Sequence, residues 1–145
     1  MKLLVQRVKK AAVIVDHQIV GKIDSGILVL IGFKIGDDDS QFERSIQKLL
    51  NLRIFQDQEG LMNLSLIDAK KEILVVSQFT LYGDASKGNR PSFIHSMGKE
   101  KAQIFYNEWV KRLKSYMPAV QTGVFSADME IDMKADGPVT IMMEF

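Results

Sequence analysis

The chain has few of the side chains that ordinary hydrolytic or metal chemistry needs. It contains no cysteine, which excludes disulfides, thiolate metal ligands and a cysteine nucleophile. Its two histidines, His17 and His95, lie far apart in sequence, and neither has a second ligand at metal-binding spacing. We expect no metal site. A Ser-His-Asp triad would require one of these histidines to meet a serine in space, and no G-x-S-x-G elbow is present.

A buried hydrophobic segment changes abruptly to polar residues at Ser77-Gln78-Phe79-Thr80. Polar groups at the end of a buried strand must be satisfied by solvent or by a ligand. One interpretation is a strand that simply leaves the core. The other is a site whose donors include the backbone N–H groups of Phe79 and Thr80, because two such amides can stabilise an oxyanion without a titratable side chain.

Three further segments have both a structural and a functional interpretation. Asp136-Gly137-Pro138 is typical of a turn before the last strand. The basic loop Lys87-Gly88-Asn89-Arg90 and the stretch Lys111-Arg112-x-Lys114 could contact phosphates, but such residues also occur on ordinary solvated surfaces. No phosphate-binding loop of the G-x-x-x-x-G-K-[ST] or G-x-G-x-x-G type is present.

Length and charge limit the classes of protein and partner. The 145 residues suit a single domain, 1–145, and 46% hydrophobic with 26% charged residues is ordinary for a soluble protein. The net charge of +1 argues against a wide duplex footprint and, if the chain meets RNA, favours a small contact such as a tRNA terminus. We expect no DNA partner. The N-terminus turns polar too early for a signal peptide, and the longest apolar run, Ile27 to Phe33, is too short to span a membrane. We therefore expect a soluble, cytoplasmic protein.

Short β-branched runs predict strands, and 3.6-residue periodicity predicts two helices. A tight turn is expected at Asp16-His17. The first helix should begin at a capping box formed by Ser40 and Glu43. The second should span about Lys99 to Tyr116. The predicted strands are Leu3 to Val8, Ala11 to Asp16, Gln18 to Ile23, Ile27 to Phe33, Asn51 to Phe55, Met62 to Ser65, Ile73 to Thr80, Ala119 to Val124, Met129 to Met133 and Pro138 to Phe145.

These elements predict an α+β single domain. We expect a largely antiparallel β-sheet or barrel, with the two main helices packed on one side.

The chain resembles the bacterial-type D-aminoacyl-tRNA deacylases, also called D-tyrosyl-tRNA deacylases, over nearly its whole length. Two residues depart from the family pattern: Ser126 stands where glycine is usual, and Ala135 where asparagine is usual. The stretches that carry the resemblance are Gln6-Arg7-Val8, Leu50 to Phe55, Met62 to Ser65, Val75 to Tyr82, Lys87 to Phe93, Thr122 to Met129 and Asp136 to Thr140.

The resemblance implies an enzyme that hydrolyses the ester of D-aminoacyl-tRNA and thereby serves translation quality control. It implies a homodimer with active sites at the subunit interface and no metal or cofactor. Ser77, Gln78, Phe79 and Thr80 would form the substrate pocket at the tRNA 3′ end. Gly137 and Pro138, joined by a cis bond and held with the help of Arg7, would reach into the partner's pocket.

The resemblance also implies how the reaction and its selectivity would work. Either the Thr80 hydroxyl acts as a nucleophile, or backbone groups and the 2′-hydroxyl of the terminal adenosine carry the reaction. The carbonyls of Gly137 and Pro138 would occupy the space that an L side chain needs. Glycine has no side chain to exclude, so glycyl-tRNA should also be cleaved. Lys87 and Arg90 are candidate tRNA contacts.

Two alternatives belong to other classes of protein. The chain could be a non-catalytic RNA- or nucleotide-binding dimeric module that uses the Lys87–Arg90 loop and an interface groove. It could also be a purely structural dimer, in which Asp136-Gly137-Pro138 is a plain turn.

Overall fold

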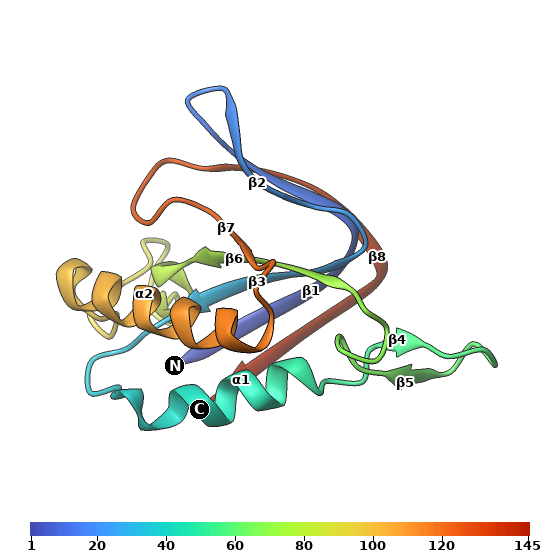
Figure 1. Ribbon diagram of the computed structural model, residues 1–145. Coiled ribbons are helices and arrows are strands. Elements are labelled where there is room, and N and C mark those ends of the chain that lie inside the picture. The colour runs from blue at the N-terminus through green and yellow to red at the C-terminus, as the bar shows by residue number, and fades with distance from the viewer.

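The strand β1 (Lys2–Val15) organises the fold because it pairs along both of its edges. The computed structural model describes residues 1–145. On one edge, the first half of β1 pairs with β3 (Gly26–Gly32) and the second half with β2 (Gln18–Ile23). On the other edge, β8 (Glu130–Glu144) runs antiparallel along nearly the whole of β1 (Figure 1).

Two strands extend this sheet in parallel. β6 (Glu72–Ser77) lies beside β3, and the short β7 (Gln121–Thr122) lies beside β6. The strand order is β2-β1-β3-β6-β7, with β8 on β1, and the sheet curls into a nearly closed barrel (Figure 1). The three antiparallel pairings of β1 outnumber the two parallel ones, so the predicted α+β class with a largely antiparallel sheet is confirmed.

The two parallel pairings also explain where the helices lie. α1 (Phe42–Leu50) is in the crossover from β3 to β6, and α2 (Lys99–Tyr116) is in the crossover from β6 to β7. Right-handed crossovers that advance in the same direction place their helices on the same face of a sheet. Figure 1 shows both helices on one side, as predicted. The remaining elements are η1 (Asp39–Gln41), β4 (Phe55–Gln56), β5 (Met62–Leu64) and η2 (Phe79–Tyr82).

The main core fills the space between the helices and the sheet. Trp109 of α2 is fully buried there, and its indole Nε1 donates a 2.9 Å hydrogen bond to Oγ of Ser45 in α1. The Ser45 hydroxyl in turn donates to the carbonyl of Phe42 at 2.7 Å. A smaller cluster, which includes Val13 and Leu74, covers the opposite face. No helix is both long and apolar enough to cross a membrane.

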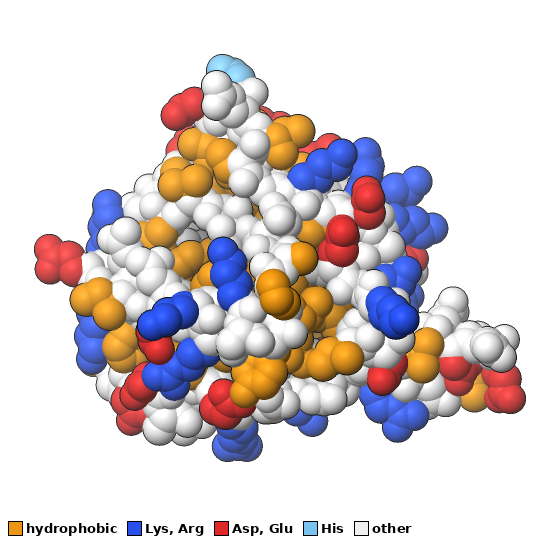
Figure 2. All heavy atoms as spheres, viewed as in Figure 1, with side chains coloured by type: hydrophobic (Ala, Val, Ile, Leu, Met, Phe, Trp, Pro, Cys, Tyr) orange, Lys and Arg blue, Asp and Glu red, His pale blue; other side chains and the backbone are white.

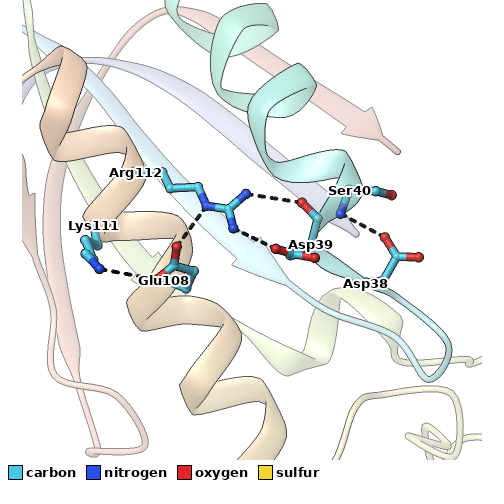
Figure 3. Close-up of polar contacts among 6 residues, drawn as sticks. All are labelled: Asp38, Asp39, Ser40, Glu108, Lys111 and Arg112. Atoms are coloured by element: carbon cyan, nitrogen blue, oxygen red, sulfur yellow. Dashed lines mark hydrogen bonds and ion pairs between the residues drawn. The ribbon is translucent and has the colours of Figure 1, made fainter.

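Arg112 joins α2 to the start of α1 (Figure 3). Its guanidinium contacts Asp39 Oδ2 at 2.6 Å and Glu108 Oε1 at 2.9 Å. The capping box predicted at Ser40 and Glu43 is wrong. Asp38 caps η1 by accepting the Ser40 amide at 2.8 Å, because the chain enters the helix through a 3-10 turn whose cap lies two residues before Ser40. Glu43 instead accepts hydrogen bonds from Gln47 and Tyr116.

The first predicted pair of strands is one continuous strand in the structure. The strands predicted at Leu3 to Val8 and Ala11 to Asp16 form β1, and the exposed Lys9 and Lys10 between them mark a shift of register against β8. The break in the alternation of buried and exposed residues at Lys9 and Lys10 therefore marks an irregularity within one strand and not the end of a strand. The turn predicted at Asp16-His17 is confirmed, with φ values of 48° and 63°.

Several predicted strand ends differ from the observed ones. The strand predicted to Thr80 ends at Ser77, because η2 begins at Phe79. Of the predicted strand from Ala119 to Val124 only Gln121–Thr122 pairs with β6. Residues 51–54 are irregular, and order resumes at β4.

Candidate functional site

A cavity of about 530 Å³ opens where β3 and β6 end, between the start of α2 and the loop that follows β7. In Figure 2, hydrophobic atoms show in the hollow between that loop and α2. Ten of its 16 lining residues are hydrophobic, so the wall is apolar with a few polar groups. This is the composition of a small-molecule site. The polar lining side chains are Ser77, Gln78, Lys99, Ser126 and Asp128.

The predicted pocket segment forms one wall of this cavity. Ser77 is the last residue of β6 and pairs with Ile31 of β3. The Gln78 amide donates a 2.7 Å hydrogen bond to the Ile31 carbonyl, which holds the segment against the sheet. The chain then turns into η2. Ser77, Gln78 and Phe79 all line the cavity.

Thr80 does not line the cavity. Its side chain is exposed, and its hydroxyl oxygen accepts a hydrogen bond from Nε2 of Gln78. The backbone amides of Phe79 and Thr80 are the first two of η2. The first amides of a helix have no acceptor within the helix. Neither amide is therefore engaged within η2, and of the two residues only Phe79 lines the cavity.

The long loop after η2 supports Phe79. Phe79 is 56% exposed, and its ring packs edge-on against Phe93, with ring centroids 5.1 Å apart. The Ser96 hydroxyl donates to the Phe79 carbonyl at 3.1 Å. Lys87 and Arg90 lie on the exposed part of this loop and outside the cavity lining.

Gly137 and Pro138 lie inside β8, so the interpretation of this segment as a plain turn before the last strand is wrong. Gln6 of β1 pairs with Thr140, and Val8 pairs with Ala135, which leaves residues 136–139 opposite Arg7 alone. The extra residues form a large bulge. The Gly137-Pro138 bond is cis, φ of Gly137 is 114°, and both residues are exposed.

Arg7, in the neighbouring strand β1, holds this bulge in place with its side chain. Its side chain is buried, and Nε lies 3.1 Å from Oδ2 of Asp136 and 3.3 Å from the Asp136 carbonyl oxygen. Nη1 donates to the carbonyl of Ile54. A buried cation requires such partners, so the position of the bulge is tied to that of Arg7.

Sequence reasoning missed Gln6 as a second support of the bulge. Its Nε2 donates to the carbonyl of Val139 at 3.2 Å, and its Oε1 accepts the Thr140 hydroxyl. A half-buried glutamine in a strand gives no signal in hydrophobic periodicity. Its place beside Arg7 in Gln6-Arg7-Val8 was the only clue.

Within one chain, the predicted pocket residues at Ser77–Thr80 and the predicted chiral-selection residues do not line the same cavity. Gly137, Pro138 and Arg7 are absent from the cavity lining, whereas Lys99 and Asp128 are present there. Lys99 carried no sequence signal, because it only begins a helix. Asp128 lies in the Thr122 to Met129 stretch, but nothing in the sequence pattern indicates a role for its side chain. No three His, Asp or Glu side chains group together as a metal site requires.

Burial raises the pKa of the Tyr106 hydroxyl beneath this region. The group therefore stays protonated and donates a 3.0 Å hydrogen bond to the Val75 carbonyl of β6. This bond fixes the strand that leads into Ser77.

Ser126, at the cavity rim, has a φ of 62°, a region that favours glycine. We predict that Ser126→Gly raises the free energy of unfolding by about 0.5–1 kcal/mol, because removal of Cβ relieves the left-handed conformation. Urea unfolding measures this. Ser126→Ala keeps Cβ and serves as the control, and a gain for alanine equal to that for glycine would contradict the explanation.

Comparisons with known proteins agree over nearly the full length. The family described as D-Tyr-tRNA(Tyr) deacylase matches residues 4–144. A D-aminoacyl-tRNA deacylase of Clostridium kluyveri is 49% identical, and one of Thermosipho melanesiensis is 48% identical; each match covers 99% of this chain and 97% of the relative.

Solved structures show the same fold. One described as c-Myc DNA Unwinding Element Binding Protein is 40% identical, with a TM-score of 0.95 over 100% of this chain and 99% of that one. A probable eukaryotic D-amino acid tRNA deacylase has a TM-score of 0.85 at 18% identity, over 98% and 97% of the two chains. The chain therefore belongs to the D-Tyr-tRNA(Tyr) deacylase family.

Proposed function

We propose that this protein hydrolyses the ester that joins a D-amino acid to the terminal adenosine of tRNA, and releases free amino acid and tRNA. The observation that carries the proposal is the cavity at the end of β6, whose wall includes the Ser77–Phe79 segment, in a chain of this family. Such an enzyme would act in the cytoplasm, where tRNA is charged and used, and would protect translation from D-amino acids.

Main-chain groups can carry the reaction. Water attacks the ester carbonyl, the bond to the ribose oxygen breaks, and a proton passes to that oxygen. The amides of Phe79 and Thr80, at the start of η2, would donate to the oxyanion that develops. The adjacent 2′-hydroxyl of the adenosine would orient the water. An aminoacyl ester is already activated, so positioning can suffice without a side-chain base.

Chiral selection would come from a second copy of the chain in a homodimer. Gly137 and Pro138 are exposed, lie outside their own cavity and are fixed by Arg7 and Gln6. A rigid exposed bulge of this kind fits the cavity of a partner. Its carbonyls would accept a hydrogen bond from the substrate amino group and fill the space of an L side chain. A D side chain would point outward.

Nucleic-acid binding without turnover is the second candidate. The relative that is 40% identical is described as a c-Myc DNA Unwinding Element Binding Protein. Lys87 and Arg90 are exposed and available for phosphate contacts. The net charge of +1 disfavours a broad backbone contact with DNA. Multiple-turnover release of amino acid separates the two candidates.

The function is tested with three charged tRNAs. Purified protein should cleave D-tyrosyl-tRNA at least about 100-fold faster, in kcat/KM, than L-tyrosyl-tRNA, because the bulge excludes the L side chain. Glycyl-tRNA should resemble the D substrate. A chelator should have no effect. Equal rates for the two enantiomers would contradict exclusion of the L side chain by the bulge. The absence of turnover would support a binding module.

Thr80→Ala should retain kcat within about tenfold, because the proposed oxyanion donor is the Thr80 backbone amide, which the substitution keeps, and because Thr80 is absent from the cavity lining. Single-turnover hydrolysis of D-tyrosyl-tRNA measures this. Thr140→Ala removes a threonine hydroxyl that contacts Gln6 beside the bulge, and it shows separately what loss of a bulge contact does to kcat. A fall of about a thousandfold for Thr80→Ala with unchanged binding would favour a nucleophilic threonine.

The dimer is tested by cross-linking, which has no background because the chain contains no cysteine. Ala135→Cys, before the bulge, is mixed with Ala127→Cys, at the cavity. A short bis-maleimide should join the two variants into a heterodimer. Ala119→Cys, exposed but outside the cavity lining, replaces Ala127→Cys in the control and should cross-link poorly. Equal yields in both mixtures, or a monomer by sedimentation, would overturn the shared site.

A further inference from the structure

A second depression of about 490 Å³, the α2 groove, adjoins the cavity. It is lined on one side by α2 and on the other by residues 122–125, and the α2 residues are Gln103, Tyr106, Asn107, Val110, Lys111 and Lys114. Phe125 lines both depressions and forms the wall between them. A ligand that fills the cavity and extends past Phe125 would enter the groove.

The α2 groove has the charge and donors of an anion site. No Asp or Glu lines it, whereas two ammonium groups and two amide side chains do. Lys114 forms none of the ion pairs of the structure, and Lys111, 81% exposed, has only a 3.9 Å contact with Glu108. Phosphodiester oxygens accept from lysine ammonium and from Gln or Asn amides.

The neighbouring Arg112 is not part of this surface. Its guanidinium faces Glu108 and Asp39, and these pairs already compensate its charge (Figure 3). Of the basic stretch Lys111-Arg112-x-Lys114, only the two lysines lie on the groove. Figure 2 shows Lys and Arg atoms over α2, close to the hydrophobic atoms of the hollow.

We propose that the α2 groove binds the phosphodiester backbone just before the terminal adenosine, while the aminoacyl ester occupies the cavity. The proposal rests on the proposed function and adds the route of the RNA. Two lysines suit a contact with about two phosphates. Such a short contact is compatible with the net charge of +1, because a small local patch needs no overall basic excess.

The test compares two double variants that remove equal charge. Lys111→Gln with Lys114→Gln should raise KM for D-tyrosyl-tRNA, and Kd for uncharged tRNA, by about tenfold, with kcat nearly kept. The slope of log Kd against log salt should fall by about 1.4, at about 0.7 per phosphate of a single strand. Lys48→Gln with Lys70→Gln, exposed but on neither depression, is the control.

Two further measurements separate the possible failures. The ratio of kcat/KM for D-tyrosyl-tRNA to that for 3′-O-D-tyrosyl-adenosine, which lacks phosphates, should fall about tenfold in the groove variant. Lys114→Arg, which keeps the charge, should bind tRNA as the unaltered protein does. If the unaltered protein hydrolyses neither substrate, the proposed function is wrong. The Kd of uncharged tRNA then still tests whether the α2 groove binds RNA. Equal Kd and salt slope in both double variants would overturn the groove.

Discussion

The buried guanidinium of Arg7 is the constraint on which the shape of the molecule's exposed bulge depends. A cation at 7% exposure must have anionic or carbonyl partners. Asp136 of β8 and the Ile54 carbonyl supply them, so two segments far apart in sequence are fixed to one side chain of β1. The bulge that carries Gly137 is consequently set by the burial of a charge in the neighbouring strand.

The helix α2 serves several parts of the molecule at once. Its buried face places Trp109 in the core, and its first turn contributes Lys99 to the cavity. Its Arg112 is used to hold the start of α1. Its Lys111 and Lys114 line the groove next to the cavity. Since one helix sets the distances among these groups, movement of α2 would change the cavity and the α2 groove together.

The sequence predicted what depends on neighbours along the chain. Periodicity located α2, and the Asp16-His17 turn followed from its place between two alternating strands. It could not predict what depends on distant partners. The bulge opposite Arg7, the approach of Lys99 to the cavity and the capping role of Asp38 all arise from tertiary packing. The pocket segment at Ser77 was visible because an apolar strand ended in polar residues. Its role in catalysis came from the family resemblance.

The bulge also affects how the sheet meets other molecules. β8 pairs with β1 along one edge, and its other edge has no partner strand. A long open edge can recruit strands from neighbouring molecules and start aggregation. In β8 this edge is interrupted near its middle by Pro138, which has no N–H to donate, and by residues that leave the ladder. The same irregularity that presents Gly137 and Pro138 to solvent therefore divides the edge into two short pieces, neither of which is a long template for fibrous growth.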